Sequence, residues 1–112
     1  MQDDDVVSVY VTAASPEEAR ALARAVLAPR LAACANVVPA VESLYWWDGR
    51  LEEAREAAVV FKTRRDRVDA LAATVRAASS YDVPCVAVWP VVGGNAAYLD
   101  WVRSEARPRP EP

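Results

Sequence analysis

The order of structural elements in this protein is decided by residues 41–62, which read VESLYWWDGRLEEAREAAVVFK. In this stretch Asp48-Gly49 separates two strand candidates. It is a strong β-hairpin signal, because both central positions of the favoured turn need a positive φ. Residues 50–58 have the composition of a helix, whereas residues 59–61 are typical of a strand. We predict a strand over residues 50–62, because the turn needs a second strand to pair with the first.

A strand and a clearly marked helix precede the hairpin. Residues 6–11, VVSVYV, are β-branched or aromatic at every position but one, which predicts a buried or half-buried strand. Ser15 is followed by a proline and, three residues after the serine, by Glu18. This is the pattern of a capped helix start with the glutamate reaching back to the cap. Pro29 predicts that the helix ends near residue 28.

The rest of the chain supplies one strand of the hairpin and three further elements. Residues 35–47 are predicted to form the first hairpin strand, bent or bulged at Pro39. Thr63 is predicted to be the N-cap of a second helix, which ends near residue 78. A strand over residues 83–90 and a short helix over residues 95–105 follow.

The predicted order is strand, helix, strand, strand, helix, strand, helix. This is the split βαβ pattern of an α+β ferredoxin-like fold, an antiparallel sheet with helices on one face. We expect a disordered N-terminus over residues 1–5, one domain over residues 6–105 and a flexible Pro-rich tail over residues 106–112. The first strand carries apolar side chains on both of its faces. The face of the sheet without helices must therefore also be buried, and another copy of the chain is the simplest candidate to bury it.

Composition excludes several classes of function. The 112 residues fit one domain, and a formal net charge of -3 is the reverse of what a nucleic-acid-binding surface needs. No apolar run approaches the roughly 20 residues that cross a bilayer, and the acidic start is unlike a secretory leader. We therefore expect a cytoplasmic protein with neither nucleic acid nor membrane as a partner.

The chain contains no histidine, so Ser-His-Asp and Cys-His nucleophiles and His-based zinc sites are excluded. This absence favours a protein that is not an enzyme. The two cysteines, Cys34 and Cys85, do not form a CxxC pair, and free thiols are expected in a reducing compartment. Their spacing leaves open whether the two side chains are close.

Five spaced blocks resemble the CutA divalent-cation tolerance family. They are LAACANVVP at 31–39, SLYWWDG at 43–49, Glu56 with Lys62-Thr63, YDVP at 81–84 and YLDW at 98–101. The resemblance implies a ferredoxin-like domain in a homotrimer similar to the PII signalling proteins, with the long hairpin reaching an adjacent subunit. It also implies a link to copper and other divalent cations, a cytoplasmic location and no established reaction.

The chain departs from the family pattern at three places. Ser79-Ser80 stands where family members typically have His-Pro, Cys85 where they usually have Glu, and Ala40 where they typically have Gly. The lost histidine removes one plausible metal ligand.

Three sets of residues are candidates for a functional site. Cys34 matches the family cysteine linked to copper, and a thiolate suits Cu(I), although a buried apolar thiol is the alternative. Polar residues at or near strand ends are candidates for a cleft between subunits that binds a small anion, by analogy with PII proteins, or for hydrogen bonds that hold the trimer. These residues are Asn36, Glu56, Lys62 and Tyr81. The aromatic residues 45–47 are candidates either to stack on a ligand or to dock on the next subunit.

The sequence thus predicts a non-enzymatic, trimeric divalent-cation tolerance protein with weak binding of copper or another divalent cation at Cys34. The alternative is a PII-like sensor that binds a small metabolite between subunits. A third hypothesis is an acylphosphatase-like hydrolase in which Arg30 and Asn36 contact phosphate. It is disfavoured because no glycine-rich phosphate-binding loop surrounds these residues.

Overall fold

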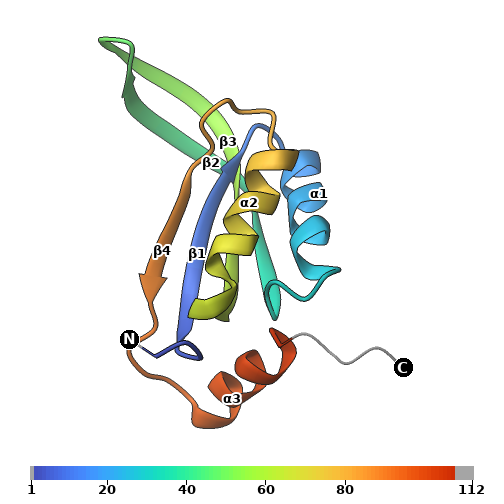
Figure 1. The fold of residues 1–112 in the computed structure, drawn as a ribbon. Helices are drawn as coiled ribbons and strands as arrows, with labels where there is room; N and C mark the ends of the chain where they lie inside the picture. Colours follow the sequence, from blue (N-terminus) through green and yellow to red (C-terminus); the bar gives the residue numbers. More distant parts are fainter. Residues whose placement is uncertain (1, 108–112) are drawn as a thin grey trace.

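The computed structural model describes residues 2–107. The elements in chain order are β1 (Val6–Ala13), α1 (Pro16–Leu27), β2 (Cys34–Trp47), β3 (Arg50–Arg64), a 3-10 helix (Arg65–Arg67), α2 (Val68–Ala78), β4 (Val86–Pro90) and α3 (Ala96–Glu105). The sheet is antiparallel throughout with the strand order β2-β3-β1-β4. This confirms the predicted α+β, ferredoxin-like arrangement (Figure 1).

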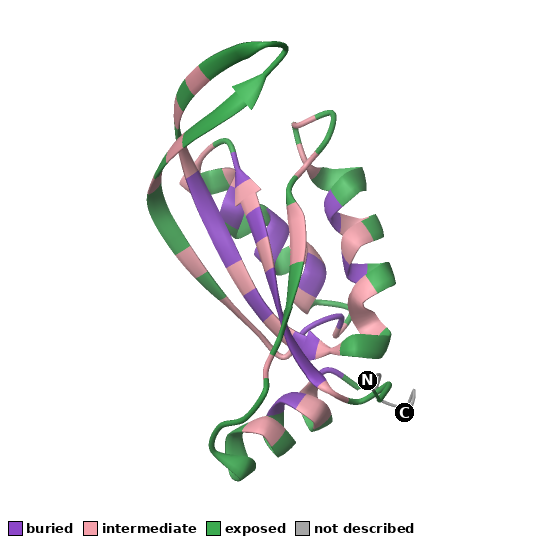
Figure 2. Cartoon of the chain, turned by 90° about the vertical axis from the view of Figure 1, so that its left-hand side faces the viewer, coloured by how far each residue is buried: buried purple, intermediate pink, exposed green. Residues whose placement is uncertain are grey.

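The hydrophobic core lies between one face of the sheet and helices α1 and α2. Val7, Val9 and Val11 of β1 pair with Thr63, Phe61 and Val59 of β3, and all six side chains are fully buried. They pack with Leu22 and Val26 of α1 and with Leu71 and Val75 of α2. Figure 2 shows this buried band running along the central strands. Phe61 is the largest of the buried side chains.

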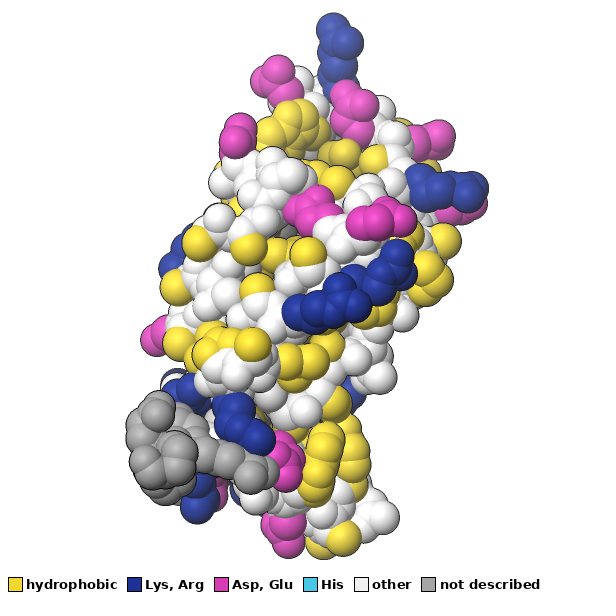
Figure 3. All heavy atoms as spheres, turned by 90° about the vertical axis from the view of Figure 1, so that its right-hand side faces the viewer, with side chains coloured by type: hydrophobic (Ala, Val, Ile, Leu, Met, Phe, Trp, Pro, Cys, Tyr) yellow, Lys and Arg dark blue, Asp and Glu magenta, His cyan; other side chains and the backbone are white. Residues whose placement is uncertain are grey.

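The opposite face of the sheet, here called the open face, has no covering helix over its centre among residues 2–107. Because side chains alternate along a strand, Ser8, Tyr10 and Thr12 lie on this face between the buried valines. Its other members from the register are Cys34, Asn36, Val38 and Val41 of β2, Glu56, Ala58, Val60 and Lys62 of β3, and Ala87 and Trp89 of β4. Val38 and Trp89 are 39% and 50% exposed. On the side of the molecule that Figure 3 shows, acidic and basic side chains are interspersed among hydrophobic ones.

The β2–β3 hairpin confirms the prediction made from Asp48-Gly49. Asp48 and Gly49 have φ values of 51° and 77°, which is the geometry that this type of two-residue turn requires. The register shifts between Val38 and Val41, so the bulge lies where Pro39 predicts it. The outer half of the hairpin projects beyond the helices (Figure 1), and Trp46 at its end is 74% exposed.

Two of the predicted element boundaries are wrong. Thr63 does not cap a helix: it belongs to β3, is fully buried, and its hydroxyl donates to the Leu31 carbonyl at 2.7 Å. Helix α2 begins at Val68 after the short 3-10 helix and has no side-chain cap. Strand β4 begins at Val86 and not at residue 83, because Pro84 has no N–H to donate to a ladder.

The residues that flank the predicted domain are partly described. Residues 2–5 form a turn whose carbonyls accept from the 3-10 helix: Arg65 N–H donates to Asp5 and Asp66 N–H donates to Asp3, both at 2.9 Å. Ala106 is fully buried. Met1 and residues 108–112 lie outside the described residues, so the predicted domain boundaries stay a prediction.

Candidate functional site

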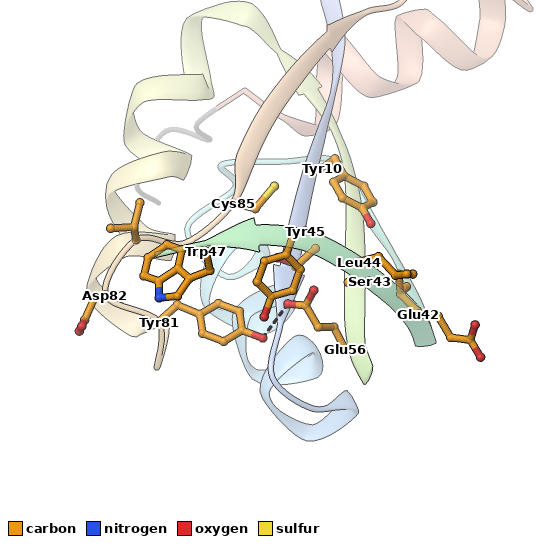
Figure 4. A pocket seen from close by; sticks show the side chains of 13 residues that line it. Tyr10, Glu42, Ser43, Leu44, Tyr45, Trp47, Glu56, Tyr81, Asp82 and Cys85 are labelled. Atoms are coloured by element: carbon orange, nitrogen blue, oxygen red, sulfur yellow. Dashed lines mark hydrogen bonds between the residues drawn. The ribbon is translucent and has the colours of Figure 1, made fainter. Parts of the chain in front are cut away.

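A cavity of about 660 Å³ lies on the open face beside the outer half of the hairpin, and we call it the hairpin cavity. Strand β1, both hairpin strands and the loop between α2 and β4 contribute to its wall (Figure 4). Its aromatic and acidic lining residues include Tyr10, Tyr45, Trp47, Glu56, Tyr81 and Asp82. The cavity is larger than a second hollow of about 400 Å³ lined by the two hairpin strands, so it is the first candidate for a ligand site.

Glu56 and Tyr81 are joined inside this cavity. The Tyr81 hydroxyl donates to Glu56 Oε2 at 2.7 Å. Burial raises the pKa of Tyr81 well above its ordinary value, and the hydrogen bond to Glu56 and the nearby negative charges raise it further. Tyr81 is therefore a neutral hydrogen-bond donor to Glu56 at neutral pH.

Glu18 holds the loop that carries Tyr81. Its backbone N–H donates to Ser15 Oγ at 3.1 Å, which confirms the predicted helix cap. Its carboxylate accepts from Ala14 N–H at 3.3 Å and also from the N–H and the hydroxyl of Ser80, both at 2.8 Å. Burial alone would raise the pKa of Glu18, but these hydrogen bonds outweigh burial and the pKa lies below its ordinary value. One carboxylate thus ties α1 to the loop after α2.

The lowered pKa of Glu18 predicts a specific acid dependence of stability. A group whose pKa is depressed by folding contributes stability above its unfolded pKa and loses that contribution as the pH falls through the folded pKa. We expect Glu18→Gln to lower the free energy of unfolding by about 1 kcal/mol at neutral pH, and the gap from wild type to close in acid. Denaturant unfolding of wild type and of Glu18→Gln, from neutral pH into acid, measures the difference in their free energies of unfolding.

The neighbouring Glu17→Gln is the control, since Glu17 makes only an exposed contact with Arg20. A gap that persists unchanged into acid would contradict this prediction.

Cys34 lies at the other end of the open face, far from the hairpin tip. It is the first residue of β2, is half-buried and pairs with Lys62 of β3. Its Sγ is 3.6 Å from the hydroxyl of Tyr98 on α3. The hydrogen bond with Cys34 raises the pKa of Tyr98, and burial adds to this shift. The nearest polar partner of the thiol is therefore a neutral tyrosine.

The two cysteines do not share a site within one chain. Strands β2 and β4 are opposite edges of the sheet, so three strand spacings, roughly 14 Å, separate Cys34 from β4. The residue of β4 level with Cys34 is Trp89, and Cys85 lies beyond the other end of that strand, so the two cysteines are also offset along the strands. Cys85 instead lines the hairpin cavity. Within the part of the chain that the structure describes, no three or more Cys, Asp or Glu side chains are grouped so as to hold a metal ion.

The four predicted cleft residues fall into two pairs. Glu56 and Tyr81 meet in the hairpin cavity, whereas Asn36 and Lys62 lie in the other half of the open face, paired with Val60 and Cys34. A cleft that uses all four residues needs more than one chain and stays a prediction.

Sequence reasoning did not find Tyr10 as a lining residue. The signal was available, because Tyr10 alternates with the core residues Val9 and Val11 and must therefore face the opposite side of the sheet. It did identify residues 45–47 as ligand or docking candidates, and Tyr45 and Trp47 do line the cavity.

The chain matches known proteins along most of its length. Residues 7–105 match the family model described as CutA1 divalent ion tolerance protein. A chloroplastic CutA 1 protein of Oryza sativa subsp. japonica is 42% identical over 101 residues, which are 90% of this chain but 57% of that protein. A chloroplastic CutA of Arabidopsis thaliana is 38% identical, and the chain again spans only 56% of its length. A divalent-cation tolerance protein CutA of Archaeoglobus fulgidus is 39% identical, with 84% of this chain and 91% of that protein covered.

Solved structures give the same result for the fold. A crystal structure of CutA1 from Oryza sativa superposes with a TM-score of 0.89 at 40% identity, covering 94% of this chain and 96% of that one. A periplasmic divalent cation tolerance protein CutA from Archaeoglobus fulgidus superposes with a TM-score of 0.87 at 35% identity, covering 91% and 99%. These relatives are described as chloroplastic or periplasmic, so they do not bear out one compartment. None of the helices within residues 2–107 is long and apolar enough to cross a membrane.

Proposed function

This chain belongs to the CutA1 divalent ion tolerance protein family, and from that premise we propose that it acts in divalent-cation tolerance as a cytoplasmic, non-enzymatic homotrimer. The observation that carries the proposal is the open face. Val38 and Trp89 are substantially exposed on this face, and Trp47 at the hairpin end is 61% exposed. Large apolar side chains exposed on one face of a sheet are typical of a surface that another protein chain covers. Copies of the same chain are the cover that the family resemblance implies.

Copper is the proposed metal, and Cys34 is its proposed ligand. A thiolate is a soft donor that suits Cu(I). The donor set beside it fits only partly, because the nearest polar group is the Tyr98 hydroxyl and the chain has no histidine. One thiol with an oxygen neighbour supports weak Cu(I) binding and not a closed, four-ligand zinc site.

Native mass spectrometry of the reduced protein, with and without Cu(I), tests both parts of this proposal. We expect a trimer mass that gains copper, and we expect Cys34→Ala to lower the copper affinity at least about tenfold because the only thiolate at that end of the sheet is lost. Cys85→Ala is the matched control and is expected to bind copper like wild type. Equal copper loss in both variants would contradict the role of Cys34, and a monomer mass would contradict the trimer.

A second candidate function is a PII-like sensor of a small molecule. The observation that favours it is the Glu56–Tyr81 hydrogen bond within the hairpin cavity, which fixes a carboxylate beside several aromatic rings. Such convergence of a few polar groups in a mostly apolar cavity is typical of ligand sites.

A further inference from the structure

We propose that helix α3 is a hinged lid over the thiol of Cys34 and that Arg30 is the latch that keeps this lid closed. The inference rests on the proposed copper binding at Cys34, because it describes how a soft metal ion reaches that thiol. Each contact that supports it lies within one chain, so none of them requires the open face to be free in the proposed trimer.

The lid is α3 itself, which lies across the end of the sheet, apart from the two helices that cover the core (Figure 1). Its Tyr98 hydroxyl is 3.6 Å from Sγ of Cys34, the first residue of β2. Cys34 is half-buried. The Tyr98 side chain therefore covers part of the thiol, and a movement of α3 away from the sheet uncovers it.

The attachment of α3 to the domain is light. Within α3 only Val102 is buried, together with Ala106 just after it, whereas α1 buries four side chains. The connection from β4, residues 91–95, has no regular structure, and nothing lies within 4 Å of where a Cβ on Gly93 would stand. Few buried apolar contacts and an exposed connection lower the cost of local opening. Opening of α3 at this hinge leaves the core of the domain folded.

The latch joins the last residue of α3 to the end of α1. Arg30 Nη1 donates to Glu105 Oε2 at 2.7 Å and to the Glu105 carbonyl at 3.2 Å. The carbonyls at a helix C-terminus have no partner within the helix, and a cation there is favourable. Hydrogen bonds from a guanidinium to a carboxylate are also stronger than neutral ones. One side chain thus holds the free end of the lid at two points.

The backbone of Arg30 supports this role. Its φ is 60°, in the left-handed region. Its N–H donates to the Leu27 carbonyl at 2.9 Å, and the N–H of Leu31 donates to the Val26 carbonyl at 3.1 Å. These two bonds form the Schellman motif, in which the left-handed residue is usually glycine because a side chain is unfavourable there. The turn does not need an arginine, so the contacts with Glu105 are what explain its side chain.

The rate at which iodoacetamide alkylates Cys34 tests the latch. The Cys85→Ala protein is the parent, because Cys34 is then the only thiol. Arg30→Gly removes the latch and suits the left-handed backbone, so we expect a folded protein that reacts at least about tenfold faster. Arg76→Gln removes the same charge from the last turn of α2, at the end of that helix away from α3 (Figure 1), and should react like the parent.

A second pair of variants tests the cover. Tyr98→Ala removes the ring beside the thiol and should also react at least about tenfold faster. Tyr98→Phe keeps the ring and loses only the hydroxyl, so its rate should stay within about threefold of the parent, since a thiol is a weak hydrogen-bonding partner.

The proposal is overturned if Arg30→Gly reacts no faster than Arg76→Gln, or if Tyr98→Ala reacts no faster than Tyr98→Phe. It is also overturned if Cys34 stays unreactive in all of these folded proteins, because a neighbouring copy and not α3 would then cover the thiol. Alkylation needs no metal. Trimer mass and copper uptake of the same samples therefore show separately whether the proposed function holds.

Discussion

Val60→Glu is expected to convert the proposed trimer into monomers at micromolar protein concentration. Val60 lies near the centre of the open face, paired with Tyr10 of β1 and Asn36 of β2. If other copies cover this face, the new carboxylate is buried without a partner, which costs about 3 kcal/mol or more at each of the three equivalent positions. Sedimentation or native mass spectrometry measures the loss of trimer directly.

The control for this variant is Val60→Thr, which keeps the branched shape and strand preference without adding a charge. We expect it to remain a trimer. A far-ultraviolet circular dichroism spectrum should show that the glutamate variant retains its helices and strands, because the fully buried core lies on the opposite face of the sheet. A Val60→Glu protein that stays trimeric with unchanged stability would show that the open face is not the interface.

The elements that the sequence predicts well are those whose signals are local. Ser15 and Glu18 mark the start of α1 through atoms only a few residues apart, and Asp48-Gly49 marks the hairpin through its own backbone angles. The hairpin turn also decides the secondary structure of β3, whose first half has a helical composition. A nonlocal pairing therefore overrides the propensity of residues 50–58.

The prediction at Thr63 is wrong because its partner is distant in sequence. The same hydroxyl that suits a helix cap donates here to the Leu31 carbonyl, a group brought close only by the folded sheet and the end of α1. Glu18 is a related case, since the local pattern indicates its bond toward the helix start but not its two bonds to Ser80. Local motifs identify donors and acceptors, whereas the fold selects which of them meet.

The candidate site was predictable only in part for the same reason. Glu56 and Tyr81 were identified by resemblance, and their direct hydrogen bond needs the loop after α2 to lie against the hairpin. The separation of Cys34 from Cys85 follows from the strand order, in which the first hairpin strand and the last strand are opposite edges. The acidic lining of the hairpin cavity could not be predicted, because its residues come from β1, the β2–β3 hairpin and the loop after α2, which are brought together only by the fold.

Phe61→Ala is expected to destabilise each chain by about 3–5 kcal/mol. Phe61 is the only phenylalanine in the sequence, is fully buried, and is the largest side chain of the core. Its neighbours across the sheet are Val9 and Ala35, which are too short to fill the space that its ring would leave. We therefore expect the upper part of this range, a large share of the roughly 5–15 kcal/mol that holds a domain folded.

Guanidinium unfolding at one fixed protomer concentration measures this loss, since the stability of an oligomer depends on concentration. Val92→Ala, at a residue that is 98% exposed, is the control and should change stability by less than about 0.5 kcal/mol. A loss below about 1 kcal/mol for Phe61→Ala would mean that the surrounding valines and alanines close over the cavity. The helices would then have to move toward the sheet, and the core would be more adaptable than its complete burial indicates.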